Sequence, residues 1–309
     1  MKFYIGVTDG DWFKYLSSIQ PDEVNFWKPS GKPFKALNPG ELFLFKLKYP
    51  DNCIVGGGYF IKNVKLPLSL AWKAFEDKNG AESFEKFSEL IYNLRKTSYQ
   101  QEPDPIISCN ILSSLFFFDE NEWIPAPPDW SPNIVQGKTY DTSTVIGRKI
   151  YNEVQDRLKT YSIEEIPLSY EEDYSARYGN PSLIFPRLGQ GAFRVLVTEA
   201  YKRRCAITGE KTLPVLEAAH IKPYSQSGPH SLNNGILLRS DFHILYDRGY
   251  LTITTDNRIV VSKRIKEDYG NGREYYKYHG KELLVLPEKH IERPAKEYIE
   301  WHNQNVFLG

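Results

Sequence analysis

The sequence predicts an α+β protein with two domains joined by a helical and irregular linker. Short apolar runs bounded by turn residues, which are typical of strands, fill the first 130 residues and return after residue 213. Other segments repeat apolar residues at helical spacing. The chain has 309 residues, of which 41% are apolar and 25% charged, so it can bury two hydrophobic cores as globular proteins do.

Residues 1–130 make up the predicted N-terminal domain. Strand patterns cover residues 2–8, 41–48, 52–64 and 106–118, and a further apolar segment covers residues 23–27. Helical spacing covers residues 12–18, 70–75 and 83–95. Asp11 can cap the first of these helices. We therefore expect a small curved β-barrel with helices laid on it.

Residues 131–184 form the predicted linker. Residues 145–159 have helical spacing, whereas residues 162–180 are acidic and rich in Tyr, with Pro and Gly among them. The linker should therefore begin with a helix and continue as an irregular connection.

Residues 185–309 make up the predicted C-terminal domain. One helix is expected over residues 193–202, and Ser240 can cap a second. A third helix is expected over residues 292–303, and His302 within it should be structural. Strands are expected over residues 213–219, 235–239 and 258–265, with two more short ones within residues 275–286, after a hairpin turn at Asn271.

Four polar residues of this domain stand at a spacing suited to chemistry: His220, Asn234, His243 and Asp247. His220 ends an apolar strand, and a loop of Ser, Gly, Pro and Asn follows it. On a helix, His243 and Asp247 lie one turn apart on the same face, so both can reach one metal ion. An imidazole titrates near neutral pH and could activate water, while an amide such as Asn234 could brace the loop. Phosphodiester hydrolysis needs such a base and a divalent cation.

Each of these residues also has an ordinary structural interpretation. A single His on an apolar strand is usually a core histidine, Asn234-Gly235 is usually a turn, and His243 with Asp247 could be a helical hydrogen-bonded pair. The conjunction of four residues at these spacings, each on the expected element, favours the catalytic interpretation.

The segment AAHIKP…NGILLRSDFHILYD resembles the HNH (ββα-metal) endonuclease family. The resemblance implies a general base at His220, a hairpin-bracing residue at Asn234 and a metal ligand at His243, with Asp247 as a second ligand. It also implies a divalent metal cofactor, Mg²⁺ or Mn²⁺, with other transition metals as alternatives.

The sequence departs from the family pattern at Ala219, where many relatives carry a metal-binding Asp or His. The third protein ligand is therefore open. Glu217 is one substitute; the other interpretation is a strand residue that faces solvent or an Arg.

Basic residues concentrate around this motif. The whole chain has no net charge, yet residues 185–267 carry 13 Lys and Arg against 7 Asp and Glu. Contact with phosphate requires such a patch. The candidates for phosphate binding are Arg187, Arg194, Lys202, Arg203, Arg204 and Lys222. The alternative for each is a solvated face or packing of the helix on the hairpin.

The N-terminal domain resembles the PUA-like superfamily (the SRA, EVE and YTH types) in GVTDGDWF, EVNFW, PGELFLFKL and IVGGGYF. Such domains take a modified base into an aromatic pocket, where stacking offsets the cost of flipping. The resemblance implies that a pocket here binds a modified base, and the candidates are Trp12, Phe26, Trp27, Asn25 and Asp9. The alternative for the aromatic residues is the barrel core.

The two resemblances together imply a protein similar to modification-dependent restriction endonucleases. The expected partner is double-stranded DNA carrying 5-methyl- or 5-hydroxymethylcytosine, cut by a homodimer because one site cuts one strand. A nuclease for unmodified DNA and a binding protein with a decayed HNH site remain as alternatives.

Three distant cysteines without a CxxC motif support neither a disulfide framework nor a zinc knuckle. The start MKFYIGVTDGDWF lacks a signal-peptide core, so we expect a cytoplasmic protein without membrane partners.

Overall fold

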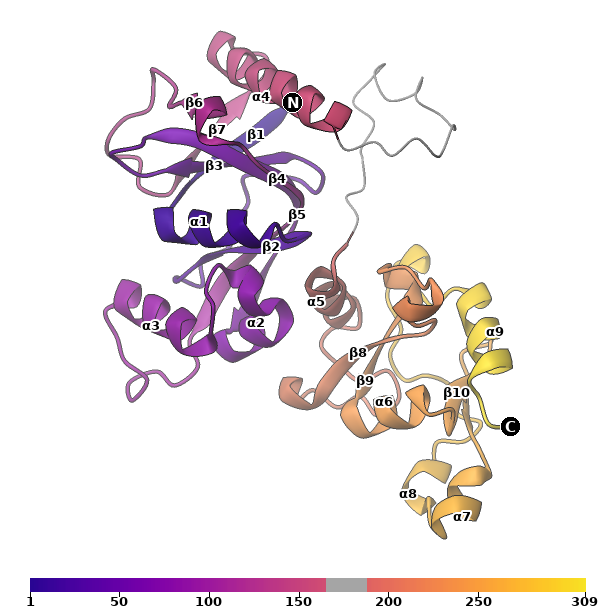
Figure 1. The fold of residues 1–309 in the computed structure, drawn as a ribbon. Coiled ribbons are helices and arrows are strands. Elements are labelled where there is room, and N and C mark those ends of the chain that lie inside the picture. Colours follow the sequence, from indigo (N-terminus) through magenta and orange to yellow (C-terminus); the bar gives the residue numbers. More distant parts are fainter. Residues whose placement is uncertain (165–187) are drawn as a thin grey trace. The chain divides into compact units, whose positions relative to one another are not determined.

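The computed structural model describes residues 1–164 and 188–309, which form two compact units, Met1–Arg187 and Leu188–Gly309 (Figure 1). Each unit mixes helices with sheet, so the predicted α+β class is confirmed. In the part of the chain that is described, no helix combines the length and the apolar character needed to cross a membrane.

The first unit is built on a seven-stranded sheet of order β2-β5-β4-β3-β1-β7, with β6 paired to β4. Its strands are β1 (Lys2–Thr8), β2 (Glu23–Lys28), β3 (Leu42–Leu47), β4 (Cys53–Pro67), β5 (Ile106–Phe117), β6 (Ile124–Pro125) and β7 (Gly137–Asp141). Only β1 and β3 pair in parallel; the other described pairs of this sheet are antiparallel. The predicted strands therefore all form, and β1 has the predicted bounds.

The helices of this unit are α1 (Gly10–Ile19), α2 (Leu68–Phe75), α3 (Phe84–Arg95) and α4 (Val145–Glu164), with a short 3-10 turn η1 (Glu76–Asn79). Asp9, not the predicted Asp11, caps α1, because the Asp9 carboxylate accepts the backbone N–H of Asp11. Ser83 caps α3 in the same way, through the N–H of Lys86.

The curved sheet buries a different core on each face, since side chains alternate along a strand. On β1, Tyr4 faces an aromatic core that includes Phe26 and Phe43. Phe3, the preceding residue, faces a second core that includes Val154 of α4. Figure 1 shows α4 beside β1 and β7. The residues predicted as a linker thus include β7 and all of α4, whereas the acidic segment beyond residue 164 lies outside the described residues.

The second unit contains α5 (Gln190–Ala200), β8 (Leu216–His220), β9 (Gly235–Arg239), α6 (Ser240–Asp247), β10 (Leu251–Ile253), β11 (Ile259–Val261), α7 (Arg264–Tyr269), α8 (Arg273–Tyr276) and α9 (Lys296–Asn305). Strands β8 and β9 form one antiparallel pair, and β10 and β11 form another. A single apolar core joins α5, both pairs, α6 and α9.

Four predictions for this unit are wrong. No hairpin turn forms at Asn271, because this residue lies between the helices α7 and α8. The strand over residues 258–265 ends at Val261, and α7 follows it. Residues 275–286 contain no named strand, because Tyr275 and Tyr278 pack edge to face with Phe242 and the chain forms α8 and a loop. Ser240 is the first residue of α6 and not its cap.

Candidate active site

The hairpin β8–β9 and helix α6 follow one another directly and carry the four motif residues. His220 stands opposite Gly235 at the end of the hairpin where the connecting loop begins. A Cβ on Gly235 would lie 2.4 Å from Val197 and 3.0 Å from Phe193, so only glycine lets α5 pack this closely on the hairpin. The helix α5 therefore supports the strand end that presents His220.

The imidazole of His220 lies between two other rings. It stacks on Phe193 with 3.9 Å between ring centroids and 11° between planes. Its Nε2 lies 2.9 Å from Nδ1 of His230, within hydrogen-bonding distance. Burial, followed by the positive charges of His230, His243 and Arg194, lowers the pKa of His220 to about 4. A neutral His220 at pH 7 can accept a proton.

Asn234 is fully buried and ties the two ends of the loop after β8 together. Its amide nitrogen donates to the carbonyl oxygens of Lys222 at 3.0 Å and Pro229 at 2.9 Å. Its amide oxygen accepts the backbone N–H of Lys222 at 2.9 Å. Both ends of the amide are therefore used to fix this loop.

The ring of His243 lies between two carboxylates. Its Nδ1 is 2.7 Å from Oε2 of Glu217 on β8, and its Nε2 is 3.2 Å from Oδ2 of Asp247, one turn further along α6. Glu217 therefore contacts His243, contrary to the expectation that it faces solvent or an Arg. Desolvation is the largest influence on Asp247 and, with the charge of Glu217, raises the pKa of its carboxyl against the opposing effect of His243.

The two nitrogens of an imidazole point in different directions, so Glu217 and Asp247 occupy different sides of His243. A histidine that binds a metal commonly donates its other N–H to a carboxylate. This arrangement suits a cation held by Nε2 of His243 and by Asp247, with Glu217 orienting the ring. No group of three or more His, Cys, Asp or Glu side chains in residues 1–164 and 188–309 is arranged to hold a metal, and Ala219 is buried without a ligand atom.

The candidates for phosphate binding differ in their contacts and in their burial. Arg194 is close enough to His220 to lower its pKa, and the ammonium group of Lys222 lies 5.6 Å from the ring centroid of Trp301. Two others form ion pairs: Lys202 with Glu288, and Arg203 with Glu199. Arg204 is half-buried, and Arg187 lies outside the described residues.

The candidates for base binding divide between the two faces of β2. Phe26 is buried in the aromatic core, where it packs against Trp12, Phe43 and Phe45, and Trp12 is buried in the same core. Asp9 is at the cap of α1, where it also pairs with Lys48 at 3.1 Å.

Asn25 and Trp27 lie on the other face of β2 and meet at Asn79 of η1. The indole nitrogens of Trp12 and Trp27 donate to the same carbonyl oxygen, that of Asn79, at 3.1 and 2.8 Å. The amide of Asn25 donates to the Asn79 side chain at 2.9 Å. These three hydrogen bonds to Asn79 therefore hold η1 against β2 and α1. Trp27, partly exposed where β2 ends, is the most accessible of the three side chains.

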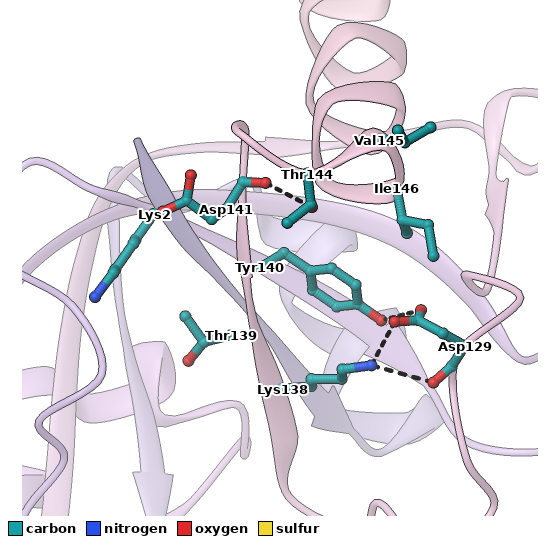
Figure 2. A pocket seen from close by; sticks show the side chains of 9 residues that line it. All are labelled: Lys2, Asp129, Lys138, Thr139, Tyr140, Asp141, Thr144, Val145 and Ile146. Carbon is teal, nitrogen blue, oxygen red and sulfur yellow. Dashed lines mark hydrogen bonds and ion pairs between the residues drawn. The ribbon is translucent and has the colours of Figure 1, made fainter.

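A pocket of about 510 Å³ lies between the end of β7 and the start of α4 (Figure 2). Two of its charged groups are paired with each other, since Asp129 accepts from Lys138 at 2.6 Å; Asp129 also accepts from the hydroxyl of Tyr140 at 2.8 Å. None of the site residues predicted from the sequence lines it.

Comparison with known proteins gives one match for the hairpin and helix: residues 205–254 match the HNH endonuclease family. No curated protein matches the chain. Among solved structures, ASCH from Zymomonas mobilis is similar, with a TM-score of 0.33 and 8% identity over 51% of this chain and 94% of that chain. The modification-dependent TagI restriction endonuclease has a TM-score of 0.28 and 13% identity over 92% of this chain and 75% of that chain.

The hairpin followed directly by a helix, with His and carboxylate side chains gathered on it, defines the ββα class of nuclease domains. Residues 205–254 form an HNH endonuclease domain, and this match supports a nuclease. HNH nucleases generally use a divalent metal.

Two contacts at this site were not predicted from the sequence. The contact of Glu217 with His243 depends on how β8 lies against α6. His230 stands in the polar loop between His220 and Asn234, and its position there was the available signal.

Proposed function

We propose that this chain is a metal-dependent DNA endonuclease in which His220 activates water and His243 with Asp247 holds the cation. The observation that carries the proposal is that β8, β9 and α6 bring a neutral imidazole and a His–carboxylate pair onto one small scaffold. The basic residues around it, Arg194 among them, suit a phosphate backbone.

Each residue of the site has its own part in the proposed hydrolysis. His220 takes a proton from the attacking water, and stacking on Phe193 fixes its ring. Asn234 keeps the loop beside His220 in one conformation. Glu217 keeps His243 turned so that Nε2 faces Asp247. The bound cation would stabilise the charge that develops on the phosphate and the leaving oxygen.

We further propose that the N-terminal unit senses 5-methyl- or 5-hydroxymethylcytosine in double-stranded DNA and that a homodimer cuts both strands. The support is the sequence resemblance of this unit to PUA-like domains. Trp27 is the best candidate for stacking on a base, because it is partly exposed whereas Trp12 and Phe26 are buried.

Digestion of matched plasmids tests both parts of the proposal. The full-length protein is incubated with Mg²⁺ or Mn²⁺ and with plasmid that is methylated, hydroxymethylated or unmodified. Cleavage of the modified plasmids alone supports both parts. Equal cleavage of all three rejects base sensing and supports a nuclease for unmodified DNA.

One observation favours a second candidate, a protein that binds modified DNA without cutting it. The position before His220 is Ala219, and the described residues bring no third ligand to His243 and Asp247. If the wild-type protein binds modified duplex but does not cut it with Mg²⁺, Mn²⁺, Co²⁺ or Ni²⁺, this candidate replaces the first.

A further inference from the structure

We propose that His230 is the positioning residue of His220: it accepts a hydrogen bond from Nε2 of His220 and so leaves Nδ1 as the base that meets water. The inference rests on the proposed nuclease function and adds to it a residue that lies between the motif positions. Its starting point is the 2.9 Å separation of His220 Nε2 and His230 Nδ1.

His230 is held in place on both its side chain and its backbone. Its ring stacks on Tyr224, with 4.5 Å between centroids and 9° between planes. The preceding carbonyl, that of Pro229, accepts from the buried amide of Asn234 at 2.9 Å and from the backbone N–H of Ser231 at 2.9 Å. The brace provided by Asn234 therefore also fixes the ring that contacts His220.

The direction of this hydrogen bond decides whether His220 can act. A neutral imidazole carries one proton on one nitrogen and a lone pair on the other. If His230 donated, Nε2 of His220 would accept and Nδ1 would hold the proton, so neither nitrogen could take another from water. If His220 donates from Nε2, Nδ1 keeps its lone pair and can act as the base.

The hydrogen bond from His220 to His230 also stabilises His220 after it has taken up a proton. When Nδ1 of His220 takes a proton from water, the ring becomes a cation, and its Nε2–H becomes a stronger donor to His230. His230 takes up no proton in this step, and it touches neither the water nor the phosphate. The same logic operates wherever a third group orients the base of a catalytic pair.

Two variants separate the hydrogen bond from packing. His230→Phe keeps a ring against Tyr224 but has no acceptor for Nε2 of His220. His230→Asn places an amide near the position of Nδ1 and can keep the acceptor. We expect His230→Phe to reduce kcat about 10- to 100-fold without changing KM, and His230→Asn to recover part of the loss. Thermal unfolding and DNA binding in EDTA show whether either variant is misfolded.

The tautomer itself is measured on the full chain labelled with ¹⁵N-histidine, which has only six His residues. Long-range ¹H–¹⁵N spectra should show the proton of His220 on Nε2 in the wild type and in His230→Asn, and on both nitrogens in exchange in His230→Phe. A wild-type His220 protonated on Nδ1, an unchanged spectrum in His230→Phe, or wild-type cleavage by His230→Phe would each overturn the proposal. If the wild type cuts no DNA, the nuclease proposal fails, and the spectra alone decide the pairing.

Discussion

Nδ1 of His243 lies 2.7 Å from Oε2 of Glu217, although 26 positions separate the two residues along the chain. The contact joins strand β8 to helix α6 and turns the other nitrogen of His243 toward Asp247. A cation site with few protein ligands depends on such orientation, because the ring can otherwise rotate away.

The first prediction concerns this contact. Glu217→Ala should lower the affinity for Mn²⁺ and the cleavage rate about 10- to 100-fold, because the ring of His243 loses its orienting partner. Glu217→Gln should lose less, since its amide oxygen can still accept from Nδ1. Isothermal titration with Mn²⁺ and cleavage at several metal concentrations measure the effect. Glu282→Gln, at an exposed ion pair with Arg258, is the matched control and should match the wild type.

The second prediction concerns Asn234. Asn234→Ala removes three hydrogen bonds and leaves the carbonyl oxygens of Lys222 and Pro229 without this donor. Each of these part-buried hydrogen bonds contributes about 0.5 to 1.5 kcal/mol. We expect a lower melting temperature in calorimetry and a lower cleavage rate, because the loop carries His230. A variant that melts and cuts like the wild type would show that the loop is fixed by other contacts.

The third prediction concerns stability at acid pH. His302 is buried in the second unit, between the carbonyl of Tyr246 at 3.1 Å and the hydroxyl of Thr252 at 2.8 Å. Burial lowers its pKa to about 4, although the hydrogen bond with Tyr246 acts in the opposite direction. The unfolded chain therefore binds more protons between about pH 6.5 and 4, and the stability that neutral His302 contributes is lost as the pH falls through this window.

Urea unfolding from pH 7 to pH 4 measures this dependence. His220 has a pKa shifted in the same direction and adds to the slope. His302→Gln should make the dependence on pH shallower in this window, whereas His290→Gln, at an exposed position, should leave it unchanged. An equal slope in wild type and His302→Gln would contradict the assignment.

Much of the fold could be predicted because its strands are apolar and bounded by turn residues. Strand β1 has its predicted bounds, and α3 begins after the cap Ser83. The prediction failed within residues 275–286, since the aromatic residues there resemble a strand in sequence. Tyr275 and Tyr278 instead pack edge to face with Phe242, a contact that depends on tertiary structure.

The site was predictable only in part, for a similar reason. The spacing from His220 to Asp247 predicted the elements that carry these residues. The ring orientation of His243, which brings in Glu217, depends on how β8 meets α6. Likewise, the sequence could not tell a base pocket from a core, and Trp12 is buried with its indole nitrogen bonded to Asn79.

The measurement that tests the central claim most directly is cleavage of modified duplex DNA by His220→Ala, with His290→Ala as the control histidine. We predict that His220→Ala still binds the duplex but cuts it about 100- to 10,000-fold more slowly than the wild type, while His290→Ala cuts normally. Wild-type cleavage by His220→Ala would contradict the account, because the imidazole at the end of β8 would then not be the base.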